Sequence, residues 1–148
     1  MTKPTEIPAT PSPFVHRIQA RVYYEDTDAG GIVYHANFLR FAERGRTEYL
    51  RALGFDHHQV RADHNLMLVV RHIEIDYRAS GLLDDRLDIA TEVVEYGNTS
   101  LTMKQVVSRG DTILAAMKVI VVAVSGIGKP VRIPPQLRQI FGSHKGLE

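Results

Sequence analysis

The sequence predicts an α+β domain in which one five-stranded, mostly antiparallel sheet wraps around a single long helix. Only residues 38–53 repeat apolar and small side chains at intervals of three and four, as a long amphipathic helix does. Five other segments have the alternating or continuously apolar character of strands. The order is strand, helix and then four strands, which is typical of an α+β domain.

The composition fits one domain, which we place at residues 14–141. The chain has 148 residues, 44% of them hydrophobic, so it can bury a substantial core. Residues 1–13 contain four prolines and no signal-peptide pattern, so we expect a mobile tail there and a frayed end at 142–148. The 18 basic and 17 acidic residues give a net charge of +1, which does not support nucleic-acid binding. The absence of cysteine excludes thiolate nucleophiles and fits a cytoplasmic protein, and no apolar run is as long as a membrane span.

The first predicted strand covers residues 14–24 and leads into an acidic turn. Residues 25–28 are Glu, Asp, Thr and Asp, which favour turns over sheet ladders. The two glycines at 30–31 permit positive φ and a close backbone approach. Asn37 is the expected N-cap of the helix, and Gly54 is the expected residue just past its end.

The helix is expected to bury one face and expose the other. Gly45 lies on the apolar stripe, where Gly costs about 1 kcal/mol of helix propensity relative to Ala. We therefore expect the sheet to pack tightly against this position, with Tyr49 in the core. On the opposite face, Glu48 has the spacing to pair with Arg44 and Arg51.

The four later strands are predicted at residues 66–77, 86–96, 100–109 and 112–124. The apolar run 119–124 is typical of a central strand. Residues 97–98 and 110–111 are hairpin signals, so the strands they join are expected to be antiparallel. Short helical turns are expected at 56–65 and 136–141. One helix cannot cover five long strands, so we expect a homodimer or homotetramer.

The most informative stretch is 24–53, because Asp28 lies seven residues before His35, where the helix is about to begin. A carboxylate beside the unpaired N–H donors of a helix N-terminus combines a candidate base or nucleophile with a site for a developing oxyanion. This combination suits attack on a carbonyl carbon. The alternative is that Asp28 is only a turn residue.

Two other carboxylates compete with Asp28. Asp26 is close enough in sequence to share its role, but we interpret it as a cap or turn acceptor. Glu43 lies on the polar face of the helix between Arg40 and Arg44, so we interpret it as solvent-exposed and salt-bridged.

The remaining candidates have weaker cases. The His35 side chain fits an acid, an orienting group or simple packing. Tyr34 and Thr99 are candidate substrate contacts, although a core position explains Tyr34 and a strand start explains Thr99. The histidines of the polar loop lack regular metal-ligand spacing, so we expect no metal site at His57, His58 and His64.

The stretch YYEDTDAGGIVYHANFLRFAERGRTEYLRALGF closely resembles the opening of hotdog-fold acyl-CoA thioesterases. Within the wider 4-hydroxybenzoyl-CoA thioesterase group, it looks most like the branch associated with the bacterial Tol-Pal cell-envelope system. The resemblance continues through LVVRHIEIDYRASGLLDDRLDIATEV and NTSL to VIVVAV, and it covers about residues 17–125. Its most specific part is the core D-T-D-x-G-G-x-V-Y-H.

The resemblance implies a hotdog fold and hydrolysis of an acyl-CoA thioester without a cofactor. The second Asp of the D-x-D pair, Asp28 here, would be the catalytic carboxylate. A backbone N–H at the position of His35 would polarise the thioester carbonyl. Family members typically dimerise by joining their sheets, with the site at the interface, so the partner chain would complete the site here too.

One departure from the family pattern concerns the carrier. Benzoyl-CoA members have basic residues just before the Ser of the segment matching 97–100, where they meet the CoA phosphates, and this chain has none there. Either other basic residues take that role, or the carrier is partly an acyl-carrier protein. The available basic residues are Arg71, Arg78, Lys129 and Arg132.

Two other functions remain open from the sequence. The spacing of Asp28 and His35 also allows a hotdog hydratase or dehydratase acting on an acyl thioester. A non-catalytic module that binds acyl-CoA or an acyl-carrier protein is the third hypothesis, although a pure binder does not need the Asp28 carboxylate.

Overall fold

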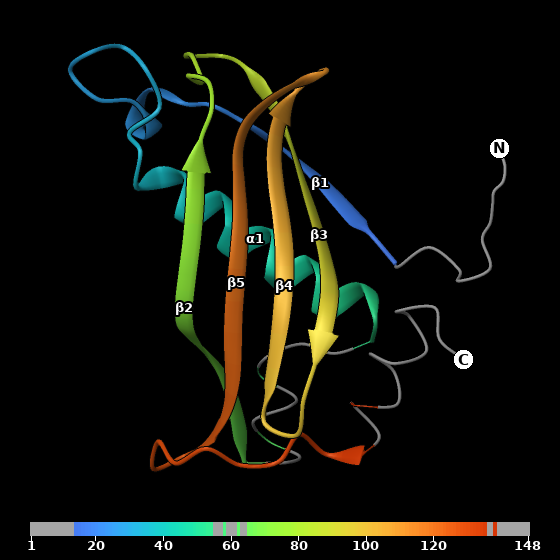
Figure 1. Ribbon diagram of the computed structural model, residues 1–148. Coiled ribbons are helices and arrows are strands. Elements are labelled where there is room, and N and C mark those ends of the chain that lie inside the picture. Colours follow the sequence, from blue (N-terminus) through green and yellow to red (C-terminus); the bar gives the residue numbers. More distant parts are fainter. Residues whose placement is uncertain (1–13, 55–57, 59–61, 63–64, 136–137, 139–148) are drawn as a thin grey trace, which may run out of the picture.

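The structure is a computed structural model that describes residues 14–54, 58, 62, 65–135 and 138. Its five strands form one sheet with the order β1-β3-β4-β5-β2, and every neighbouring pair is antiparallel. Among these described residues one long helix, α1, crosses one face of the sheet (Figure 1). The elements are β1 (His16–Arg21), η1 (Tyr24–Asp26), α1 (Asn37–Ala52), β2 (Leu66–Tyr77), β3 (Arg86–Tyr96), β4 (Ser100–Arg109) and β5 (Thr112–Ser125).

The predicted α+β class and the five-stranded sheet are confirmed, and both hairpins between β3, β4 and β5 are antiparallel as expected. The first strand is shorter than predicted, because residues 24–26 leave the sheet and form the 3-10 turn η1. The apolar end of β5 lies in an interior strand, between β4 and β2. Four predicted features lie wholly or mostly outside the described residues: the tail at 1–13, the helical turns at 56–65 and 136–141, and the frayed end at 142–148.

The helix start differs from the prediction, whereas its end agrees with it. Asn37 is the first helical residue and not the N-cap; Ala36 occupies the cap position and makes no side-chain cap bond. The Asn37 side chain is used elsewhere, in a bond to Asp26. Gly54 follows the C-cap Leu53 with a φ of +96°, which a glycine adopts without strain.

The helix packs against the sheet through Gly45, as predicted. A Cβ at Gly45 would lie 2.7 Å from Thr91 Oγ1 and 2.8 Å from Ile89 Cγ2, both on β3. The side-chain amide of Gln105 on β4 donates to the carbonyl of Ala42 at 2.8 Å and to Thr91 Oγ1 at 2.9 Å. These buried polar bonds fix the height of the helix over the sheet, and the close contacts at Gly45 disfavour a larger residue there.

A second feature of the sheet is a bulge in its edge strand β2. The pairing of β2 with β5 shifts register between Val70 and His72. Val70 pairs with Val121 before the bulge, and Ile73 pairs with Val119 after it. Side chains on both halves of β2 therefore reach the helix-bearing face, although simple alternation would have reversed one half.

Candidate active site

Asp28 lies at the tip of a small hairpin that joins η1 to the helix. Its backbone N–H donates to the carbonyl of Ile32 at 2.9 Å, and its own carbonyl accepts from Gly31 N–H at 3.0 Å. Its carboxylate accepts a 2.8 Å bond from the N–H of Gly30. Gly31 has a φ of +80°, so the tight turn uses the conformational freedom that the two glycines predicted. The Asp28 side chain is exposed, which leaves the second carboxylate oxygen open to a substrate or water.

Asp26 anchors this hairpin to the helix. Its buried carboxylate accepts from the side-chain amide of Asn37 at 2.7 Å and from the N–H of Tyr23 at 2.8 Å. Its carbonyl accepts from Tyr34 N–H at 2.9 Å. Every one of these bonds is internal, so the geometry agrees with the structural role expected for Asp26 and leaves Asp28 as the exposed carboxylate.

The helix entrance presents two free amide donors. In the described part of the chain, no hydrogen bond uses the backbone N–H of His35 or of Ala36. The carbonyl oxygens of the same two peptide groups are hydrogen-bonded: that of Tyr34 accepts from Asn37 N–H at 2.8 Å, and that of His35 accepts from Phe38 N–H at 3.3 Å. Unpaired N–H groups at a helix N-terminus carry partial positive charge, so this entrance can hold an oxyanion.

Aromatic side chains surround this entrance. The exposed His35 ring lies 4.7 Å from the ring of Tyr34 and 6.1 Å from that of Tyr77. Tyr34 is 47% exposed, so its predicted place in the core is wrong and its candidate role as a substrate contact stays open. Tyr49 is 1% exposed and lies in the core, as predicted. Burial, opposed in part by a backbone hydrogen bond with Val93, raises the pKa of Tyr49 to about 12.

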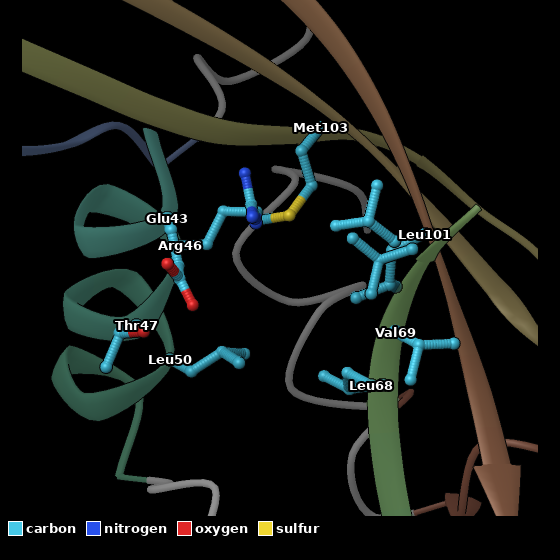
Figure 2. Close-up of a pocket in the computed structure, with 10 residues that line it drawn as sticks. Glu43, Arg46, Thr47, Leu50, Leu68, Val69, Leu101 and Met103 are labelled. Atoms are coloured by element: carbon cyan, nitrogen blue, oxygen red, sulfur yellow. The ribbon is translucent and has the colours of Figure 1, made fainter. Parts of the chain in front are cut away.

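An apolar cavity of about 320 Å³ lies between the second half of α1 and the first half of β2. Figure 2 shows helix side chains on one side of it and sheet side chains on the other. Leu50 points from the helix toward Leu68 across the cavity, and Met103 lines it from β4. A cavity of this size and character suits a small apolar group.

Two oppositely charged residues, Arg46 and Glu43, also line the cavity. Arg46 donates to Gln105 Oε1 at 3.0 Å and is half-buried. Burial lowers the pKa of the Arg46 guanidinium, and the Glu43 carboxylate opposes this shift. Glu43 is exposed as expected, but its electrostatic partner is Arg46, whereas Arg44 lies over the ring of Phe41. The predicted pairing of Glu48 with Arg51 is confirmed at 2.6 Å.

Within one protomer the structure does not bring Thr99 to Asp28 and His35. Thr99 accepts from the N–H of Ala123, near the end of β5 that pairs with the start of β2. The helix entrance lies at the other end of β2, where Tyr77 contacts His35. Sequence reasoning missed Tyr77 and the cavity residues; the only signal for Tyr77 was its place at the end of an alternating strand.

The basic residues considered for CoA phosphates are spread over the surface. Arg78 is held by Asp76 at 2.8 Å, and Arg71 lies exposed at the bulge of β2. Lys129 and Arg132 follow β5. The described residues contain no cluster of three His, Cys, Asp or Glu side chains that fits a metal ion, and none of their helices has the length and apolar character to cross a membrane.

Comparison with known proteins identifies the family of this chain. The family model described as the Thioesterase-like superfamily matches residues 22–141. The acyl-CoA thioesterase YbgC of Haemophilus influenzae is 43% identical over 122 residues, which are 82% of this chain and 90% of that protein. The acyl-CoA thioester hydrolase YbgC of Escherichia coli O157:H7 is 42% identical over 123 residues, which are 82% of this chain and 91% of that protein.

Similarity to solved structures agrees with these matches. A probable thioesterase from Bartonella henselae superposes with a TM-score of 0.79 at 38% identity, and the match covers 82% of this chain and all of that one. The hotdog fold implied by the sequence resemblance is therefore confirmed. The chain belongs to the Thioesterase-like superfamily.

Proposed function

We propose that this protein hydrolyses acyl-CoA thioesters to a free acid and CoA. The identity of 42–43% to proteins named acyl-CoA thioesterase and acyl-CoA thioester hydrolase, over most of both chains, supports the reaction. The single structural observation that supports the site is the exposed Asp28 carboxylate, on a hairpin bonded directly to a helix entrance where no described residue accepts from the N–H groups of His35 and Ala36.

The chemistry follows from this arrangement. The thioester carbonyl oxygen accepts from the N–H groups of His35 and Ala36, which stabilise the negative charge that develops there. Asp28 either takes a proton from a water molecule that attacks the carbonyl carbon, or attacks that carbon itself to form a mixed anhydride that water then cleaves. In both routes the C–S bond breaks, the CoA thiolate leaves and is protonated, and the oxygen gained by the acid comes from water.

The active unit in this proposal is a homodimer joined through β2. This strand is a 12-residue edge that pairs on one side only among the described residues, and Val69 and Val70 on it are 38% and 43% exposed. Such an edge readily pairs with a second copy. A two-fold antiparallel pairing would place the Leu66 end of one strand beside the Tyr77 end of the other. The cavity and Thr99 of one subunit would then lie near Asp28 of the partner, and the exposed carboxylate would be shielded from bulk water.

The acyl group is assigned to the cavity between α1 and β2. Its wall is largely apolar, with Leu50, Leu68, Leu101 and Met103, and its volume of about 320 Å³ has room for part or all of an acyl group. The candidate contacts for the CoA phosphates are Arg71, Arg78, Lys129 and Arg132.

The cellular setting rests on the sequence alone. The 24–53 stretch supports a place in the Tol-Pal-associated branch. The absence of cysteine fits a cytoplasmic protein, and the absence of basic residues just before Ser100 makes an acyl-carrier protein a second candidate carrier. Parallel assays with acyl-CoA and the same acyl group on an acyl-carrier protein decide between the two carriers.

The test of the proposed function is a thiol-release assay over short, long and aromatic acyl-CoAs, with Asp28→Asn beside the wild type. Removing the carboxylate is expected to lower kcat by about 100-fold or more. Asp111→Asn, at another exposed turn, is the matched control and is expected to retain full turnover. Near-full turnover by a folded Asp28→Asn protein would exclude the assignment. Loss of an enoyl-CoA double bond without thiol release would indicate a hydratase instead.

A further inference from the structure

We infer that Tyr77 is a positioning residue for the reaction, because its hydroxyl fixes the peptide group that supplies one of the two oxyanion donors. The inference rests on the proposed thioesterase function and adds a residue to it. Tyr77 is the last residue of β2, 42 positions from His35 in sequence, and its hydroxyl donates to the carbonyl oxygen of His35 at 3.1 Å.

The contact places the end of a sheet strand directly on the helix entrance. The Tyr77 ring lies 6.1 Å from the His35 ring in an edge-on arrangement and 5.9 Å from the ring of Phe38. Phe38 is buried in the core, so it provides a fixed surface for the tyrosine. Tyr77 itself is 43% exposed, so the side chain lies at the surface of the protomer beside the entrance.

The hydroxyl acts on a particular peptide group. The carbonyl of His35 and the N–H of Ala36 belong to the same planar amide, so a bond to the oxygen fixes the direction of the N–H. The only other bond to this oxygen within the described chain is a long one, from Phe38 N–H at 3.3 Å. The neighbouring amide needs no such support, since its oxygen, on Tyr34, accepts from Asn37 N–H at 2.8 Å.

The hydroxyl also makes the donor stronger. An amide that accepts a hydrogen bond at its oxygen is polarised, and its N–H becomes a better donor, by about 10–30% per bond in condensed-phase estimates. Without Tyr77, the Ala36 N–H would keep its place at the helix start but lose this orientation and polarisation. The loss is felt most when charge develops on the substrate oxygen, which is in the transition state.

Tyr77→Phe isolates the hydroxyl because the ring and its packing remain. We expect kcat to fall about 5- to 10-fold, which corresponds to about 1 kcal/mol of lost transition-state stabilisation, while KM changes less than about twofold. Tyr24→Phe removes the hydroxyl of a tyrosine that is 83% exposed, and it is expected to match the wild type. Unchanged kcat in folded Tyr77→Phe would overturn the inference and leave the thioesterase assignment standing. Absence of thiol release by the wild type would overturn both.

A binding measurement separates positioning from general loosening of the structure. A trifluoromethyl ketone analogue of acyl-CoA forms an oxyanion-like adduct or hydrate, whereas a thioether analogue with no carbonyl places no charge at the donors. Tyr77→Phe is expected to weaken the ketone about 5-fold or more and to leave the thioether affinity unchanged. An equal loss for both analogues would mean a purely structural role and would refute the inference.

Discussion

The side-chain amide of Asn37 donates a 2.7 Å hydrogen bond to the buried carboxylate of Asp26, and this bond joins the first residue of α1 to the hairpin that carries Asp28. The same carboxylate accepts from Tyr23 N–H, so it holds both sides of the junction. The two carboxylates of the D-x-D pair therefore have different roles: that of Asp26 joins the hairpin to the helix, and that of Asp28 is exposed to solvent.

Removal of the Asp26 carboxylate is expected to destabilise the fold and disturb the site together. Asp26→Ala leaves two donors, on Asn37 and Tyr23, without their partner, which costs about 2–3 kcal/mol of unfolding free energy. It should also lower kcat about tenfold or more, because Asp28 loses its fixed position. Urea denaturation and thiol release measure the two effects.

The exposed pair Gln19 and Asp88, with a 3.2 Å bond, is the matched control, and Gln19→Ala should change the unfolding free energy by less than about 0.5 kcal/mol. A double-mutant cycle over Asp26→Ala and Asn37→Ala is expected to be strongly non-additive. Additive effects would show that the two side chains do not act through their mutual bond.

Gly45→Ala is expected to destabilise the protein even though Ala is the better helix former. The gain in helix propensity is about 1 kcal/mol, but the new methyl meets Thr91 Oγ1 at 2.7 Å and Ile89 Cγ2 at 2.8 Å. Both neighbours are fully buried, so they cannot move aside cheaply. We expect a net loss of about 1–2 kcal/mol by urea denaturation. Gly97→Ala, where the Cβ meets nothing closer than 3.6 Å, is the control; equal effects of the two changes would contradict this account.

The stability of the protein is expected to fall between pH 10 and about pH 12 through Tyr49. Burial raises the pKa of its phenol from 10.0 in the unfolded chain to about 12 in the folded one. The folded state therefore binds this proton more tightly in that window, so the unfolding free energy decreases as pH rises and is fully retained below pH 10. Denaturation of the wild type and of Tyr49→Phe over this range isolates the effect, and Tyr23→Phe serves as an exposed control. Parallel curves for all three proteins would rule it out.

The interface proposed on β2 is tested by a charge on its exposed edge. Val70→Lys should dissociate the dimer, because a lysine on each copy of a two-fold strand pair places like charges close together. Val94→Lys, on β3 with 40% exposure, carries the same charge away from that edge and should leave the oligomer intact. Sedimentation velocity measures both. A wild-type monomer, or a Val70→Lys protein with an unchanged sedimentation coefficient, would argue against the β2 interface.

The strand and helix periods predicted most of the fold because each depends on local patterns. The boundaries of β2, β3 and β4 agree with the prediction, since their alternation ends at clear turn residues. The expected N-cap at Asn37 was wrong for a tertiary reason. Its side-chain amide donates to Asp26, eleven residues away, and capping preferences read from neighbouring residues do not take such a bond into account.

The site was only partly predictable. Asp28 and the helix entrance are adjacent in sequence, so the motif located them together. Tyr77 reaches His35 across 42 residues, and Leu68 lines a cavity with Leu50 because β2 is the edge strand of the sheet, paired with β5. Contacts of this kind depend on strand order, and the sequence pattern contains no direct record of strand order.

Because of the register shift at Arg71, the face on which the side chains of the first half of β2 lie is set separately from that of the second half. Deleting one residue at the bulge would turn the first half over, exchanging Leu68 and Val70 for their neighbours along the cavity while Tyr77 kept its place. Such a change would reshape the cavity of one subunit and, across the proposed dimer, the surface beside the helix entrance of the other. Relatives that differ in substrate preference are expected to differ on the N-terminal side of this one position.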